Sequence, residues 1–200
     1  MLVRKNKRVK NIINLIETFK VANVDHVADL YYCNYKKKEH AYIKANERLR
    51  KLAQEKTLKR KRSDINSKYC YYIDKEPKQI EHSIKLTDLY VELCMIYGQD
   101  NIQMIPEYTA IEGVRPDAYL RIKHSNRLYL FYVEIHRSND FDIGKYEAIY
   151  RNDKVFPTLL IVTEKKLKLE TRLNYIVVKE DLEGLEDTLG IGKSTFTVLN

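Results

Sequence analysis

Positive charge is concentrated in the first 75 residues of this 200-residue chain. Residues 1–75 contain 20 Lys or Arg and 8 Asp or Glu, a net charge of +12, whereas residues 76–200 contain 16 and 20, a net charge of −4. A basic segment joined to a mildly acidic one is typical of a nucleic-acid-binding domain connected to a domain with another task. The split therefore predicts two domains, residues 1–76 and residues 77–200.

The composition supports two folded domains. Hydrophobic residues make up 44% of the chain, which is enough apolar material for real cores. No apolar run approaches the roughly 20 residues of a membrane span, so we expect a cytoplasmic protein that does not contact a membrane. Three cysteines with gaps of unequal length fit neither a disulfide framework nor a zinc pattern: Cys33, Cys70 and Cys94.

Three helices are expected in the first domain. Apolar residues at helical spacing predict helices over residues 8–19, 24–31 and 36–54, with Asn23 as the N-cap of the second. Tyr42, Ala45, Leu49 and Leu52 form the expected apolar stripe of the third helix. A short helix, a tight turn and a longer helix are typical of a helix-turn-helix motif.

The third predicted helix carries basic side chains on its outer face. In a helix-turn-helix, the second helix of the motif enters the major groove, where side-chain donors can read base edges. The candidate DNA-binding residues on this helix are Lys36, Lys37, Lys38, His40, Lys44, Arg48 and Lys51.

A basic hairpin is expected after the third helix. Residues 63–67 have turn composition, and the residues beyond them alternate like a strand. Four consecutive cations precede the turn and complete the candidate DNA-binding set: Lys59, Arg60, Lys61 and Arg62. Three helices followed by a basic hairpin predict a winged helix that binds double-stranded DNA with steep salt dependence.

The second domain is expected to be α/β. The pattern predicts a helix over residues 77–97, strands over 102–111, 114–123 and 128–136, a helix over 140–152 and a strand over 158–162. A short helix near 165–173, a strand at 175–178 and a helix near 181–189 should follow. This order is that of the PD-(D/E)xK nuclease core, so the predicted fold class is α+β: an N-terminal winged helix-turn-helix followed by a C-terminal PD-(D/E)xK nuclease-like α/β domain.

Asp117, Glu134 and His136 occupy the positions of the nuclease motif. In such enzymes the two carboxylates hold Mg²⁺, which generates the attacking water, and a lysine follows at the third position. Because His136 replaces that lysine, the prediction favours a binding protein without enzymatic activity or a cofactor. Asp117 and Glu134 are metal ligands, and His136 is catalytic, only if the domain is a nuclease. Lys145 or Arg137 could then supply the missing charge.

The pattern resembles the replication-relaxation family of Gram-positive plasmids, conjugative elements and phages. The resemblance rests on the N-terminal helices and hairpin, residues 81–90, 115–120 and 132–138, and Tyr146. It implies a winged helix followed by a nuclease-like domain without an intact active site. Family members commonly have Glu-x-Asp where this chain has Glu134 and His136.

Three hypotheses follow from these patterns. The leading one is a double-stranded DNA-binding protein of a plasmid or phage that assists replication, DNA relaxation, transfer by conjugation, or the regulation of these steps. Its second domain would form a homodimer or dock a relaxase or replication protein. The alternatives are a Mg²⁺-dependent DNA endonuclease with an atypical Glu-x-His site, and a transcriptional repressor.

Overall fold

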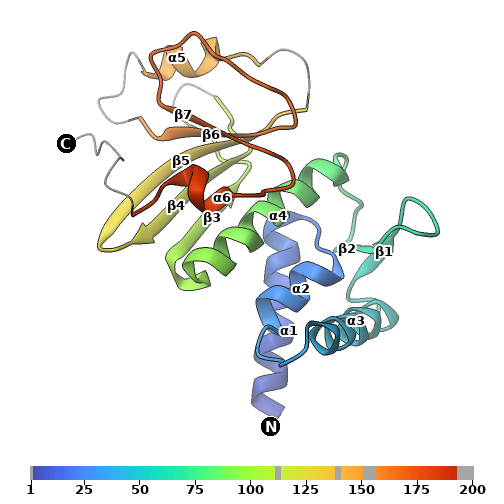
Figure 1. The fold of residues 1–200 in the computed structure, drawn as a ribbon. Coiled ribbons are helices and arrows are strands. Elements are labelled where there is room, and N and C mark those ends of the chain that lie inside the picture. Colours follow the sequence, from blue (N-terminus) through green and yellow to red (C-terminus); the bar gives the residue numbers. More distant parts are fainter. Residues whose placement is uncertain (1, 111–113, 138–140, 151–155, 193–200) are drawn as a thin grey trace. The chain divides into compact units, whose positions relative to one another are not determined.

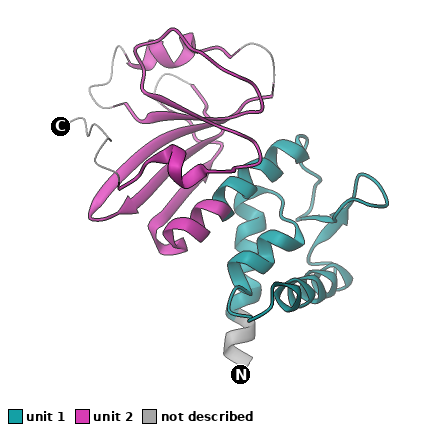
Figure 2. Ribbon diagram, in the orientation of Figure 1, with its two compact units in different colours: residues 1–91 teal, residues 92–200 magenta. Residues whose placement is uncertain are grey.

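The computed structural model is α+β and describes residues 2–110, 114–137, 141–150 and 156–192 (Figure 1). The chain divides into two compact units, residues 1–91 (unit 1) and residues 92–200 (unit 2), coloured separately in Figure 2. The division falls within helix α4 (Ile80–Tyr97), whereas the boundary predicted from sequence, between residues 76 and 77, precedes this helix.

Unit 1 begins with three helices and a hairpin. Ile12, Leu15, Ile16 and Phe19 lie on one face of the first helix and are buried, as their spacing predicts. Residues 80–91 of α4 belong to the same unit, and the Phe19 and Tyr90 rings lie 4.6 Å apart. The elements before α4 are α1 (Leu2–Phe19), α2 (Val24–Tyr31), α3 (Lys38–Gln54), β1 (Lys59–Lys61) and β2 (Cys70–Tyr72).

The second and third helices match their predicted boundaries closely, whereas α1 begins at Leu2, six residues before its predicted start at residue 8. The α2 bounds agree with the prediction, and the Asn23 side chain caps this helix by accepting a hydrogen bond from the His26 amide at 3.1 Å. Helix α3 ends where predicted but begins two residues later. Its buried stripe differs at one position: Ala41 is buried with Ala45, Leu49 and Leu52, whereas Tyr42 is exposed.

Unit 2 is built around a five-stranded mixed sheet with the order β3-β4-β5-β6-β7. The first three strands are antiparallel, and the last three are parallel to one another. Helix α5 (Gly144–Tyr150) connects the parallel pair β5 and β6, as a parallel pairing requires a crossover. The strands are β3 (Ile102–Pro106), β4 (Ala118–His124), β5 (Arg127–Ile135), β6 (Thr158–Val162) and β7 (Tyr175–Val178).

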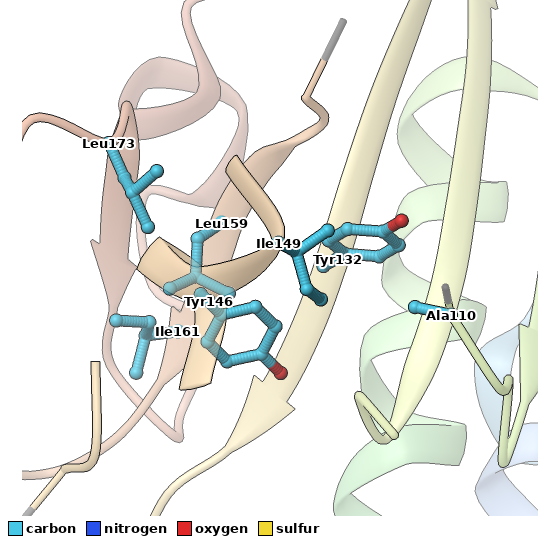
Figure 3. Packing of buried hydrophobic residues seen from close by; sticks show 7 residues of the cluster. All are labelled: Ala110, Tyr132, Tyr146, Ile149, Leu159, Ile161 and Leu173. Carbon is cyan, nitrogen blue, oxygen red and sulfur yellow. The ribbon is translucent and has the colours of Figure 1, made fainter. Parts of the chain in front are cut away.

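One face of this sheet packs against α5. Figure 3 shows Tyr146 and Ile149 of α5 beside Tyr132 of β5 and Leu159 and Ile161 of β6, and all five side chains are buried. Strand β5 lies in the middle of the sheet, and its last five residues are buried, so its side chains are covered on both faces there. The side chains of these five residues therefore lie in a largely dry environment.

Several expectations for the second predicted domain need correction. Helix α4 begins at Ile80 rather than at residue 77, β3 ends at Pro106 before the predicted residue 111, and β4 begins at Ala118 rather than at residue 114. Residues 164–173 contain no helix: Leu167 and Leu169 pack on the α5 cluster, and the residues between and after them are exposed. That alternation is the pattern of an extended segment. The last helix, α6 (Leu185–Leu189), is shorter than expected. The predicted helix over 140–152 also extends into residues outside the described ranges, and within them it covers α5.

Candidate nucleic-acid interface and carboxylate site

The segment before α2 pairs with the β1–β2 hairpin as a third extended stretch. Ala22 and Tyr71 exchange backbone hydrogen bonds of 3.0 and 2.8 Å in an antiparallel bridge. Tyr71 is buried, so the bridge anchors the base of the hairpin to the helical core of unit 1. The hairpin therefore has a fixed position beside α3.

A groove of about 450 Å³ lies between α3 and the hairpin. Four of its lining side chains are cationic, and no Asp or Glu lines it. Its polar and aromatic lining includes Asn46, Asn66, Ser67, Tyr42 and Tyr69. The cations are Arg50 of α3, Arg60 and Arg62 of the first hairpin arm, and Lys68 of the second.

Aromatic contacts orient the hairpin arginines. The guanidinium groups of Arg60 and Arg62 lie 4.4 and 5.1 Å from the centre of the Tyr69 ring. Such cation–π contacts hold a planar guanidinium against the ring while its N–H groups remain able to donate. Lys68 forms an ion pair with Asp25 of α2, which does not line the groove. Asp25 raises the pKa of the Lys68 ammonium, which stays charged.

A second hollow lies between the C-terminal end of α3 and the base of the hairpin. It has a volume of about 520 Å³ and shares Arg50 and Arg60 with the groove. Lys56 and Lys59 add two more cations, and again no acidic residue lines it. The two hollows therefore adjoin at Arg50 and Arg60, and both are lined by cations without an acidic residue.

The sequence predicted part of this surface. Arg60 and Arg62 line the groove, and Lys59 lines the second hollow. Lys61 is also exposed but forms an ion pair of 2.6 Å with Glu76. Lys59 donates to the backbone oxygen of Asp74. All four hairpin cations are therefore on the surface, as predicted.

The candidates on α3 lie on other faces of the helix. Lys36, Lys37, Lys38 and His40 are exposed around its N-terminus. Lys44 pairs with Glu47 at 2.8 Å and Lys51 with Glu55 at 3.7 Å, while Arg48 is half-buried. At 100° per residue these three cations lie on the flank opposite Tyr42 and Asn46, and none of them lines the groove.

Sequence reasoning missed several groove residues. Arg50, Asn46 and Tyr42 share one face of α3, since they are spaced by four residues. Because Tyr42 was assigned to the buried stripe, the face of α3 that lines the groove was not recognised. The available signal was Ala41: the stripe 41, 45, 49 and 52 is as regular as the predicted one and turns Tyr42 outward.

Unit 2 brings together the two carboxylates of the predicted nuclease motif. Asp117 immediately precedes β4, and its Oδ2 accepts a hydrogen bond of 2.7 Å from the backbone amide of Ile135 on β5. Glu134 precedes Ile135 and is 8% exposed. The antiparallel pairing of Ala118 with Val133 places the two acidic residues at adjacent positions across the strands.

Helix α5 supplies two donors to Glu134. The Lys145 ammonium donates to Glu134 Oε1 at 2.7 Å, and the Tyr146 hydroxyl donates to the same oxygen. Burial raises the pKa of the Glu134 carboxyl, the nearby Asp117 carboxylate raises it further, and the Lys145 and Tyr146 donors oppose that rise. Burial and the charge of Glu134 raise the pKa of Tyr146, so its phenol stays neutral and remains a donor.

His136 directly follows the end of β5 and is buried. Its backbone amide donates to Val162 of β6 at 2.8 Å, and its ring contacts Phe141 edge to face at 5.0 Å. His136 is therefore packed into the sheet, whereas the cation beside Glu134 comes from α5. The two carboxylates are oxygen ligands of the kind that Mg²⁺ accepts. No group of three His, Cys, Asp or Glu side chains within the described ranges could hold a metal ion.

Comparisons with protein-family models, with curated proteins and with solved structures find no match to this chain. No helix in the part of the chain that the structure describes is both long and apolar enough to cross a membrane.

Proposed function

We propose that unit 1 is a winged helix that binds double-stranded DNA, in a protein of a plasmid or phage. The observation that carries this proposal is the groove between α3 and the hairpin, with four cations and no acidic lining residue. A duplex presents regularly spaced phosphates, and cations on two sides of a groove can contact them. The anchored hairpin gives these contacts a fixed geometry.

The two ends of α3 would have different tasks in this complex. Lys36–Lys38 and His40 are exposed where the helix begins, so they are the side chains that would enter the major groove and reach base edges. Arg50, Arg60, Arg62 and Lys68 would hold the phosphate backbone beside it. Phosphate contacts fix the register, and base contacts supply sequence preference.

Binding of the full-length protein to duplex DNA at several salt concentrations tests the proposal. Each phosphate contact contributes about 0.9 to the slope of log affinity against log salt, so Arg50→Gln, Arg60→Gln and Arg62→Gln together should reduce that slope by about 2–3. Lys166→Gln, Lys168→Gln and Lys179→Gln together, at exposed positions of unit 2, are the matched control and should leave the slope unchanged. Absence of duplex binding at low salt, or equal effects of both sets, would overturn the proposal.

A second candidate function is metal-dependent phosphodiester cleavage by unit 2. The observation that favours it is the Lys145 ammonium beside Glu134, which gives the carboxylate pair the positive charge that His136 does not provide. Asp117 and Glu134 would hold a Mg²⁺ ion, which when bound supplies a hydroxide nucleophile and stabilises the leaving oxygen. Lys145 would stabilise negative charge on the scissile phosphate.

Incubation of supercoiled DNA with Mg²⁺ or Mn²⁺ separates the two functions. A nuclease would nick the DNA, and Asp117→Ala, Glu134→Ala and Lys145→Met would each abolish nicking while leaving binding by unit 1 intact. A purely DNA-binding protein would leave the substrate uncut. Uncut DNA is the result that the leading proposal, a DNA-binding protein, predicts.

A further inference from the structure

Ile65 is the most exposed large hydrophobic side chain among the residues that the structure describes. It is 77% exposed and stands at the tip of the β1–β2 hairpin. An aliphatic side chain at this degree of exposure contributes little to the core of unit 1. Single exposed hydrophobic side chains are common on protein surfaces, but this one stands at the end of a basic hairpin.

The turn that presents Ile65 is held in a defined conformation by its neighbours. Asp64 Oδ1 accepts hydrogen bonds from the backbone amides of Asn66 at 2.8 Å and Ser67 at 2.9 Å. Arg62 Nη1 donates to the Ile65 backbone oxygen at 3.0 Å. These hydrogen bonds fix the backbone of the turn, and the Ile65 side chain projects into solvent.

Cations flank the tip on both arms of the hairpin. Arg60 and Arg62 precede the turn and Lys68 follows it, against the single acidic residue Asp64 within the turn. The hydrogen bonds that Asp64 accepts lower the pKa of its carboxyl, and they engage its oxygens within the turn. An apolar tip on a basic stem matches the minor groove, which is bounded by two lines of phosphates and lined by base edges.

We propose that Ile65 enters the minor groove of bound DNA and wedges open a base step, so that the duplex bends. Branched and unbranched aliphatic side chains inserted in this way partially unstack a step and kink the duplex toward the major groove. The wedge favours flexible pyrimidine–purine steps, which unstack most readily. This inference rests on the proposed DNA-binding function and adds to it a deformation of the DNA.

The test compares bending and binding in the full-length protein. The probe is a duplex of about two helical turns with a central TA step and a donor–acceptor dye pair at its ends. The wild type should shorten the end-to-end distance, and Ile65→Ala should bind the probe but leave it straight. Leu128→Ala is the matched control, since Leu128 is an aliphatic side chain, 51% exposed, on the β5 strand of unit 2. It should bend the probe as the wild type does.

A second probe carries a mismatched central step, whose stacking is already weakened. The wild type should bind it about tenfold more tightly than the paired duplex, because part of the unstacking cost is removed, and Ile65→Ala should bind both alike. Duplex binding without bending, or equal bending by Ile65→Ala and the wild type, would overturn the wedge and leave the DNA-binding proposal standing. Absence of binding by the wild type would overturn both.

Discussion

The Lys145 ammonium lies 2.7 Å from Glu134 Oε1, so helix α5 places a positive charge on a carboxylate that β5 carries into the interior of unit 2. The Tyr146 hydroxyl donates to the same oxygen. Two donors from consecutive residues of one helix thus oppose part of the effect of burial on the pKa of a single acidic group. A buried carboxylate with a raised pKa, a lysine and a second acid are the groups from which hydrolytic sites are built, and also those of a purely structural ion pair.

Lys145→Met should raise the pKa of Glu134 further. The ammonium is one of the groups that hold this pKa down, and methionine keeps much of the side-chain volume without the charge. Titration of the glutamate carboxyl carbons by NMR measures the change. Lys123→Met, at an exposed position on β4, is the matched control and should leave the Glu134 titration where it is. An unchanged titration in Lys145→Met would show that the ion pair does not form in solution.

Glu134→Gln should change how the stability of unit 2 depends on pH. Because the folded-state pKa of Glu134 is raised, the folded protein binds more protons than the unfolded chain once the pH exceeds the unfolded value near 4.5. The wild type therefore loses stability from Glu134 as the pH rises from about 4.5 through the folded-state pKa. The variant lacks that loss, so its unfolding free energy relative to wild type should increase over this window. Urea unfolding at several pH values checks the sign, and a constant difference would contradict it.

The helices and most strands could be predicted because their signals are local. Val24 to Tyr31 is preceded by a recognisable N-cap, and α4 ends at Tyr97, directly before Gly98, whose φ of +84° suits glycine. The extended segment with Leu167 and Leu169 was predicted as a helix. Its apolar residues are too few to distinguish the spacing of a helix from the alternation of a strand. Packing on the α5 cluster decides its conformation, and that packing is not visible in the sequence.

The candidate sites were predictable in type but not in detail. Asp117 and Glu134 could be identified from their strands, and Lys145 was one of two residues expected to supply charge. The groove face of α3 was missed because it depends on where the hairpin lies, and the Ala22–Tyr71 bridge that fixes the hairpin is a contact between distant residues. No local pattern specifies such a contact.

His40→Ala should change sequence preference more than it changes affinity for bulk DNA, whereas Arg62→Gln should weaken binding to all sequences alike. His40 is exposed near the start of α3, and Arg62 lines the groove. A lost base contact costs about 1–3 kcal/mol at one position of the site, but a lost phosphate contact carries no sequence information. Selection of each variant against a randomised duplex library measures both effects. Equal loss across all sequences for His40→Ala would exclude base reading by this residue.

His26→Ala should destabilise unit 1 by about 1–3 kcal/mol. The Asn23 backbone amide donates to His26 Nδ1 at 3.2 Å, so Nδ1 is unprotonated, and Nε2 carries the hydrogen that is donated to Asp88 at 2.6 Å. Alanine removes both bonds and opens space at a side chain that is 3% exposed. His40→Ala is the matched control: its side chain is exposed, so the cost should stay within about 0.5 kcal/mol. Hydrogen exchange of the α2 amides measures this local stability, and equal exchange in the two variants would show that the His26 network does not hold α2 in place.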